Sequence, residues 1–148
     1  IGIIHTPFSQ KEECPIQGVY ANNTNGSIEV FTQHAAGLKD IEGFSHIFLF
    51  YHFDRAGEIK YVRPTFLDET PHGIYASRHP CRPNGIGISL VKLLRRDKNR
   101  LEVEGIDVLN QTPLLDIKPY IPTFDVFPSA TEGWAADKEF SSKPAGRE

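Results

Sequence analysis

The chain has 148 residues, which is enough for one domain with a sizeable buried core. Its composition, 39% hydrophobic and 24% charged, is ordinary for a globular protein, and no apolar run approaches the roughly 20 residues of a membrane-spanning helix. The net charge of −3 argues against bulk attraction to nucleic acid, so RNA binding would need a local basic patch. With no visible signal peptide, we expect a cytoplasmic protein that makes no membrane contact. Its single domain would span residues 1–140, followed by a disordered tail at 141–148.

The first half of the chain predicts short strands separated by turns. Residues 2–6 form a strand that a proline stops, and residues 14–18 form a rigid corner. The dipeptide Asn25-Gly26 is a hairpin-turn signal. The other elements expected before residue 71 are a strand at 27–32, one or two helical turns at 35–41, a strand at 44–54 and an edge strand near 61–64. The strand at 44–54 is the most hydrophobic, so we expect it at the centre of the fold.

The histidines and cysteines do not predict a metal site. His46 and His52 lie on the same face of the central strand, about 20 Å apart at the rise of an extended chain, which is too far to share an ion. Each is better explained as a core or pocket-lining residue. Cys14 and Cys81 have no metal-ligand spacing. We expect two reduced thiols, with a disulfide between them as the alternative.

A proline-rich corner at residues 78–85 lies between two extended segments. Apolar and polar residues alternate over 74–77 and over 86–90, which is the period of a half-buried strand. Pro80 and Pro83 bar a helix, and the glycine that ends the corner can adopt a positive φ. The corner carries two arginines, a histidine and an amide, more donors than a turn requires. The alternative is a hairpin whose arginines only decorate the surface.

Strands continue after the corner. Residues 86–94 and 101–108 predict a hairpin, and a basic cluster follows the corner along it: Lys92, Arg95, Arg96, Lys98 and Arg100. This cluster is either a patch for RNA or a solvated hairpin tip. Residues 114–121 are extended, and residues 131–140 predict a short helix that is capped by its first residue and anchored by Trp134. Six or seven short strands with little helix indicate an all-β barrel or sandwich.

The sequence lacks the motifs of the common nucleotide-binding and hydrolytic folds. Neither G-x-G-x-x-G after a strand, G-x-x-x-x-G-K-[ST] nor G-x-S-x-G is present. Arg78 and Arg82 on the rigid corner suit an anionic group, because a guanidinium binds a carboxylate or phosphate through two hydrogen bonds. Asp116 and Lys118 are two residues apart on an extended segment and share a face. Asp116 is therefore either salt-bridged and structural or catalytic.

At the corner, the sequence R-H-P-C-R-P-N-G-I-G-I-S resembles the signature of the TsaA-like family. The resemblance continues in order along most of the chain, with P-I-Q-G at 15–18, G-L-K-D-I-E-G-F-S-H-I at 37–47, G-I-Y-A-S-R-H-P-C-R-P-N at 73–84, I-G-I-S-L-V at 86–91, G-I-D-V-L at 105–109 and T-P-L-L-D-I-K-P-Y-I-P at 112–122. Members of that family are S-adenosylmethionine-dependent methyltransferases that act on N6-threonylcarbamoyladenosine beside the anticodon of tRNA. The resemblance therefore implies a small non-Rossmann β-barrel that works as a homodimer, uses S-adenosylmethionine without a metal, and binds the tRNA anticodon loop.

The resemblance also implies roles for individual residues. The cofactor-binding residues would be Pro15, Ile16, Gln17, Phe53, Asp54, Arg78, Ile88, Asp107, Val108, Leu109 and Asn110. The catalytic residues would be Asp116, Arg82 and Asn84, and the substrate-binding residues Arg82, Lys118, Tyr120 and Tyr75. In this scheme Asp116 is the base that removes the N6 proton, while Arg82 and Lys118 hold the threonyl carboxylate. Either tyrosine would stack on the unpaired base.

Two positions depart from the family pattern. Gly85 stands where members usually have proline, and Asn110-Gln111 replaces an Asp-Gly pair in the turn before residue 112. An amide at residue 110 can still form hydrogen bonds, but it cannot supply a charge. Two other functions remain open: a non-catalytic barrel that binds RNA or a small anion, and a hydrolase that uses Asp116 or a histidine.

Overall fold

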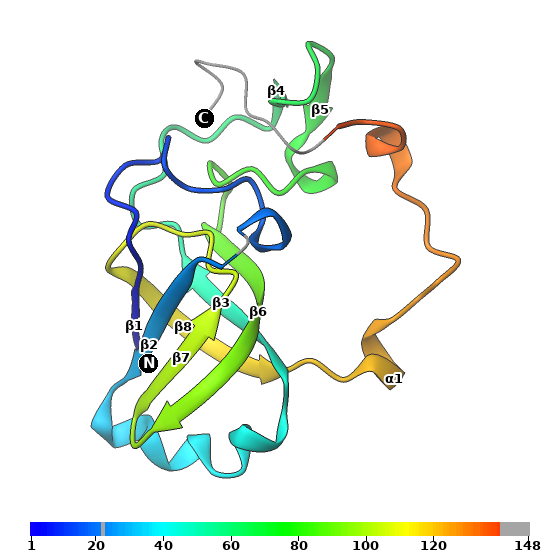
Figure 1. The fold of residues 1–148 in the computed structure, drawn as a ribbon. Coiled ribbons are helices and arrows are strands. Elements are labelled where there is room, and N and C mark those ends of the chain that lie inside the picture. Colours follow the sequence, from blue (N-terminus) through cyan, green and yellow to red (C-terminus); the bar gives the residue numbers. More distant parts are fainter. Residues whose placement is uncertain (22, 140–148) are drawn as a thin grey trace.

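The computed structural model describes residues 1–21 and 23–139, and its main feature is a closed antiparallel barrel (Figure 1). Six strands pair around the barrel in the order β1–β2–β7–β6–β3–β8. Their bounds are β1 Gly2–His5, β2 Asn25–Val30, β3 His46–His52, β6 Ile86–Asp97, β7 Arg100–Glu104 and β8 Thr112–Pro119. Strands β4 (Val62–Pro64) and β5 (Pro71–Gly73) form a separate two-stranded sheet. The predicted all-β barrel is confirmed.

Helical structure in the described residues is limited to short turns. The α-helix α1 spans Pro122–Asp125, and 3-10 turns lie at Gly18–Tyr20, Thr32–Leu38, Ile41–Gly43, Ile74–Ala76 and Gly133–Ala135. None of these described helices has the length and apolar character needed to cross a bilayer. After α1 the chain returns along the outside of the barrel to the β4–β5 sheet (Figure 1). There Trp134 stacks on His72 at 3.8 Å and donates a hydrogen bond to the Ala76 carbonyl.

The barrel interior is aliphatic because each strand sends alternate residues inward. In β3 the inward residues are Ile47, Leu49 and Tyr51, whereas Phe48 and Phe50 face outward. Strand β3 pairs with both β6 and β8, so the most hydrophobic strand of the sequence is central to the fold, as predicted. The other large side chains with no more than 1% exposure in this core are Ile4, Ile28, Leu101, Ile106 and Leu114.

The first half of strand β6 directs its larger apolar side chains toward the outside of the barrel. Its apolar residues Ile86, Ile88 and Leu90 face outward and are 48%, 39% and 41% exposed. The first two inward positions, Gly87 and Ser89, are small because the ring of Tyr51 on β3 lies opposite Gly87 in the register. Further along the strand, Val91 faces into the core. A Cβ at Gly87 would lie only 2.1 Å from a carbon of that ring. The residue must therefore be glycine for Tyr51 to occupy the barrel interior.

Several local predictions were wrong. Asn25-Gly26 is not a turn but the start of β2, where it pairs with Glu104 and Val103, and Gly26 leaves room for the carbonyl of His5. Residues 74–76 form a 3-10 turn rather than a strand, because buried Ile74 points into the structure.

The second hairpin and the C-terminal segment also differ from expectation. The tip is only two residues long, with Asp97 paired to Arg100, and Lys98 takes the positive φ that such a tight turn needs. The predicted helix at 131–140 is reduced to a three-residue turn that lacks a side-chain cap. Residue 140 and the predicted tail at 141–148 lie outside the described residues.

The two histidines of β3 have different environments. His46 is half-buried, hydrogen-bonds to the Ser45 hydroxyl and meets the Tyr120 ring edge-on. His52 is exposed at the end of the strand, so it is not a core residue. Cys14 and Cys81 do not form a disulfide with each other, in agreement with the prediction of two thiols.

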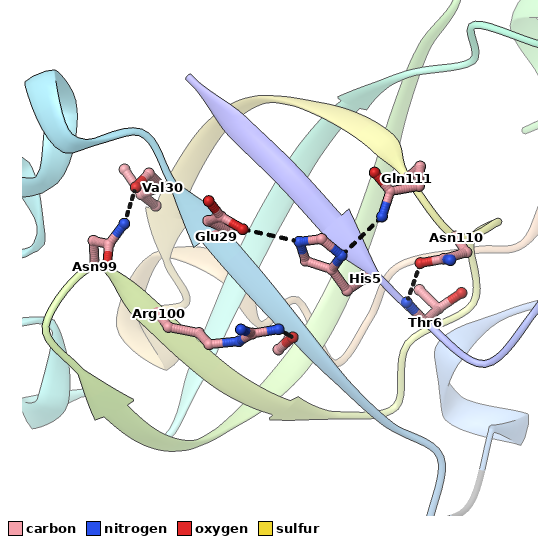
Figure 2. A network of polar contacts seen from close by, with 9 residues as sticks. His5, Thr6, Glu29, Val30, Asn99, Arg100, Asn110 and Gln111 are labelled. Carbon is pink, nitrogen blue, oxygen red and sulfur yellow. Dashed lines mark hydrogen bonds and ion pairs between the residues drawn. The ribbon is translucent and has the colours of Figure 1, made fainter.

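Polar side chains join β1 to its neighbours, and His5 is at the centre of this network (Figure 2). Its Nε2 lies 3.2 Å from a carboxylate oxygen of Glu29 on β2, and the Gln111 amide donates to its Nδ1 at 2.9 Å. The next residue, Thr6, donates its backbone N–H to the side-chain oxygen of Asn110. These contacts tie a strand of only four residues to the β2 and β8 sides of the barrel.

The close approach at Gly87 predicts that Gly87→Ala destabilises the barrel. The added methyl group has to displace the buried Tyr51 ring, so we expect a loss of about 1–3 kcal/mol in the free energy of unfolding, measured by urea denaturation. Gly37→Ala is the control, because nothing lies within 4 Å of a Cβ at that position. Equal stability of the two variants would contradict this account of β6.

Candidate functional site

A buried acid lies where three loops meet the barrel wall. Asp107 follows β7, and its carboxylate accepts hydrogen bonds from the Ser89 hydroxyl of β6 and the backbone N–H of Gly18. The Tyr51 hydroxyl lies 3.1 Å from Ser89 Oγ. Because the single proton of Ser89 is donated to Asp107, Tyr51 must be the donor in its own hydrogen bond with Ser89. The result is a chain of hydrogen bonds that runs from the barrel interior to the carboxylate.

Burial dominates the electrostatics of this cluster. It raises the pKa of Asp107 to about 6, although the hydrogen bonds from Ser89 and Gly18 and the charge of Arg78 favour the ionised form. Part of the Asp107 residue surface remains exposed, but its carboxylate is deeply enclosed. Burial also raises the pKa of the Tyr51 phenol, and the nearby Asp107 charge raises it further. Tyr51 therefore stays protonated and keeps its role as a donor.

The corner at residues 14–18 packs directly on the loop that carries Asp107. A Cβ at Gly18 would lie 2.3 Å from the carbonyl oxygen of Gly105, so only glycine permits this approach. Gly105 itself has a φ of +88°, which ends β7 and turns the chain toward Asp107. Two glycines thus place the 14–18 corner against the buried acid.

The proline-rich corner joins the same site through Arg78. Its guanidinium donates a 2.8 Å hydrogen bond to the side-chain oxygen of Gln17, which links residues 61 apart in the chain. Gln17 in turn donates to the Ile16 carbonyl. Gly85, at the end of the corner, has the predicted positive φ of +57° and accepts a hydrogen bond from the Phe53 backbone. The sequence-predicted residues Gln17, Arg78 and Asp107 are therefore brought together from three separate loops.

Other predicted cofactor residues surround this point. Phe53 meets the Tyr51 ring edge-on at 5.3 Å, and Pro15 and Ile16 are half-buried on the 14–18 corner. Val108 is buried, and its carbonyl accepts a hydrogen bond from the Thr6 hydroxyl. These residues give the site apolar walls next to its charged groups.

Four other predicted cofactor residues have different contacts or orientations. Asn110 accepts the Thr6 backbone N–H through its side chain, and the Leu109 carbonyl accepts the Thr112 hydroxyl. Asp54 pairs with the neighbouring Arg55 at 3.2 Å. Ile88 faces outward on β6, on the opposite side from Ser89. At residue 110 an amide thus serves a structural hydrogen bond for which a charge is not needed.

The structure places the predicted catalytic base apart from the buried acid. Asp116 lies on the outer face of β8 opposite Phe50, and its carboxylate is 3.3 Å from Lys118 Nζ. Both side chains of the pair are more than half exposed, at 51% and 62%. The salt bridge considered in the sequence analysis is therefore present. Tyr120, beyond the end of the strand, packs edge-on against Phe48 at 5.7 Å.

The remaining predicted residues lie on or near the proline-rich corner. Arg82 is half-buried and donates to the Ser77 carbonyl at 3.0 Å. Asn84 is exposed, and Tyr75 is 75% exposed. Both are accessible to a large ligand, but the structure does not bring either one to Asp107.

Sequence reasoning missed Tyr51 and Ser89. Both lie on predicted strands, but the candidate site residues were chosen mainly among arginines and acids, and neither Tyr51 nor Ser89 was among them. A usable signal was present, because Gly87 and Ser89 are small residues at alternate positions of a strand that otherwise reads as aliphatic. Small residues on one face of a strand indicate that something bulky packs there.

The basic cluster of the β6–β7 hairpin is largely neutralised. Lys92 pairs with Glu104 at 3.7 Å, Arg95 with Glu102 at 2.6 Å and Arg96 with Glu42 at 2.9 Å. This arrangement favours the solvated-hairpin interpretation over a patch for RNA. In the part of the chain that the structure describes, no group of three or more histidine, cysteine, aspartate or glutamate residues could hold a metal ion.

A small closed barrel with polar loops at one end defines the structural class, and comparison with known proteins defines the family. The sequence model of the tRNA-methyltransferase O N-terminal domain matches residues 3–126. The chain belongs to this family.

Its relatives carry related names. A probable S-adenosyl-L-methionine-binding protein of Pyrococcus abyssi is 49% identical over 134 residues, covering 90% of this chain and 73% of that protein. The tRNA (adenine(37)-N6)-methyltransferase of Escherichia coli K12 is 32% identical over 145 residues, covering 91% of this chain and 62% of that protein. A crystal structure of TrmO superposes with a TM-score of 0.79 at 37% identity, covering 90% of this chain but 61% of that one. The chain thus spans about three fifths of the length of these last two proteins.

The raised pKa of Asp107 predicts how stability depends on pH. A carboxyl group whose pKa is higher in the folded state than its ordinary value of 3.8 stabilises the fold only while it is protonated. Its contribution is lost as pH rises from about 4 through about 6. Asp107→Asn should remove up to about 3 kcal/mol of this pH dependence, measured by urea denaturation from pH 4 to pH 7.5.

Asp97→Asn, at the exposed end of β6, controls for the loss of one carboxylate. If wild type and Asp107→Asn show parallel stability profiles over this range, the carboxylate is not held in the unfavourable environment described.

Proposed function

We propose that this chain binds S-adenosylmethionine and transfers its methyl group to N6 of an adenine in tRNA. The observation that carries the proposal is the convergence of Gln17, Arg78 and Asp107 at one end of the barrel, in a chain of this family. The names of the relatives support both the cofactor and the tRNA substrate. Such a role would place the protein in the cytoplasm.

The residues of the site fit this cofactor. Arg78 makes no ion pair among the described residues, so its guanidinium is available for the carboxylate of the methionine moiety. Asp107 offers a negative charge for an ammonium group or hydroxyls, and Pro15, Ile16 and Phe53 offer apolar surface. When bound, S-adenosylmethionine supplies an electrophilic methyl group on its sulfonium. The loops around Asp107 would contribute to the rate chiefly by orienting the methyl donor toward the nucleophile, since an in-line displacement depends on the positions of the reacting groups.

We also propose the finer substrate, N6-threonylcarbamoyladenosine beside the anticodon. Its carboxylate needs a cation, for which Arg82 and Lys118 are candidates. Asp116 would accept the proton from N6. The Nζ of Lys118, 3.3 Å from the Asp116 carboxylate, would hold the Asp116 side chain in place. Tyr75 is exposed enough to stack on an unpaired base, and Tyr120 could do so beside Phe48. Asn84, exposed on the corner, stays in the predicted catalytic set.

The outward apolar face of the barrel supports a homodimer. Leu90 lies beside Phe48 and Ile88 beside Phe50 across the β6–β3 pair, and Ile86 extends the row. These exposed aliphatic side chains form a contiguous patch of the kind that marks protein interfaces. Asp116 and Lys118 border this patch on β8. A second copy placed on this face would therefore bring its own side chains next to the proposed base.

Cofactor binding is the first test of the proposal. Isothermal titration calorimetry should show that S-adenosylmethionine binds the wild-type protein. Arg78→Ala should weaken that binding about 10–100-fold, since it removes a charge-assisted hydrogen bond. Lys39→Ala removes an exposed cation and serves as the control. Lys39 directly follows the 3-10 turn Thr32–Leu38, which lies at the opposite end of the barrel (Figure 1). Absence of binding by the folded wild-type protein would favour a non-catalytic module that binds RNA or a small anion. Product formation without the cofactor would favour a hydrolase.

The dimer proposal has its own test. Leu90→Lys places a charge in the centre of the outward apolar face and should convert a dimer to a monomer, as measured by light scattering after gel filtration. Val62→Lys is the matched control, because Val62 is 65% exposed on β4, outside the barrel. A wild-type protein that is monomeric, or a Leu90→Lys variant that remains dimeric, would contradict this interface.

A further inference from the structure

A second group of cationic side chains lies between the proline-rich corner and the β4–β5 sheet. Arg63 is the central residue of β4, and it is half-buried between exposed neighbours. His79 and Arg82 belong to the corner and are half-buried as well. Both arginines lie close enough to His79 for their charges to act on its imidazole. The functional assignment above uses Arg82 alone among these three residues.

The side chain of Arg63 has a buried nitrogen without a hydrogen-bond partner. Its Nε is buried, yet it has no hydrogen-bond partner, and it is the sole side-chain atom of this kind among the described residues. Buried polar groups are almost always hydrogen-bonded in folded proteins, and this holds most strongly for groups that carry charge. A buried guanidinium N–H without an acceptor in residues 1–21 and 23–139 therefore needs an acceptor from elsewhere, and a bound anion would supply one.

His79 is arranged as a neutral donor. Its Nδ1 accepts the backbone N–H of Cys81 at 3.0 Å, so the proton of the neutral ring must be on Nε2. Burial and then the charges of Arg63 and Arg82 lower the pKa of His79 to about 4. At neutral pH the imidazole is therefore uncharged and presents an N–H group, without adding a third positive charge to the cluster.

Among the described residues, no acid neutralises this cluster. Neither Arg63 nor Arg82 forms an ion pair within residues 1–21 and 23–139, in contrast to Arg55, Arg95 and Arg96. Arg82 donates one bond to a carbonyl and keeps further donors for a ligand. Strand β5 places His72 opposite Arg63, but the acid beside it, Asp68, is already held by Lys138 at 2.9 Å and by His72 at 3.3 Å. Two guanidiniums without a counter-charge need an anion.

We propose that Arg63, His79 and Arg82 form a binding site for one oxyanion of the nucleic-acid substrate. Two sources share this chemistry: a phosphate of the RNA backbone and the carboxylate of a threonylcarbamoylated base. The inference rests on the proposed tRNA substrate and adds Arg63 and His79 to the residues that hold it. Because the site lies outside the Asp107 cluster, it binds substrate and not the methyl donor.

The test is the affinity of Arg63→Gln for tRNA, measured by filter binding at several salt concentrations, with and without the threonylcarbamoyl group. If the anion is a phosphate, affinity for both tRNAs falls and the slope of log K against log salt concentration decreases in magnitude by about 1. If the anion is the carboxylate, affinity falls about tenfold or more for the modified tRNA alone. Unchanged affinity for both tRNAs would overturn the proposal.

Three variants make the result specific. Lys39→Gln removes one exposed cation next to the 3-10 turn Thr32–Leu38 and controls for net charge. Arg63→Lys keeps the charge but lacks the Nε–H, so it should recover the salt slope only in part. Arg82→Gln should reproduce the loss seen with Arg63→Gln, and it replaces that variant if thermal unfolding shows that Arg63→Gln does not fold.

Inorganic phosphate separates this inference from the proposed function. If the site exists, phosphate raises the melting temperature of the wild-type protein more than that of Arg82→Gln, whether or not the protein methylates tRNA. S-adenosylmethionine should still bind Arg63→Gln with wild-type affinity. If phosphate stabilises both proteins equally, the assignment of the site is wrong even when methylation is observed.

Discussion

The contact between Tyr51 and Gly87 is the constraint on which the rest of the structure depends. A large ring enters the barrel only because the opposing strand has no side chain at that position. From there the phenol reaches Ser89, and Ser89 holds the carboxylate of Asp107. In the same arrangement Ile86, Ile88 and Leu90 of β6 face outward. The hydrogen-bonded Asp107 and the exposed apolar face of β6 therefore both depend on the packing of Tyr51 against Gly87.

Charge is distributed unevenly over the molecule, and the distribution separates structure from function. Lys92, Arg95 and Arg96 of the β6–β7 hairpin are paired with glutamates and contribute little beyond solubility, as exposed ion pairs usually do. Arg63 on β4 and Arg78 and Arg82 on the proline-rich corner lie instead outside the barrel strands and lack acidic partners among the described residues. In a chain with a net charge of −3, cations left unpaired at one end indicate where anionic ligands are received.

Alternation and turn chemistry were sufficient to predict an all-β fold, the central position of β3 and the positive φ of Gly85. They were insufficient for the direction in which β6 faces, because that depends on Tyr51, 36 residues earlier in the chain. Asn25-Gly26 has the composition of a turn, yet it is a strand start because it pairs with β7 and packs under His5. The family motifs were sufficient to predict that Gln17, Arg78 and Asp107 share one site. The hydrogen bond from Ser89 to Asp107 could not be predicted, because residue spacing within the sequence does not show which side chains meet across strands and loops.

The barrel closes through its shortest strand. Strand β1, with four residues, pairs on one side with β2 and on the other with β8, whose partner residues lie more than 100 positions later. Such non-local pairing makes folding slow, because the entropy of a long loop is lost before the contacts that compensate for it form. During synthesis β8 emerges late, so β1 and β3 would each present an unpaired edge until the ring is complete. Unpaired edges associate with other chains, and this protein is therefore most exposed to aggregation in the interval before residue 119 leaves the ribosome.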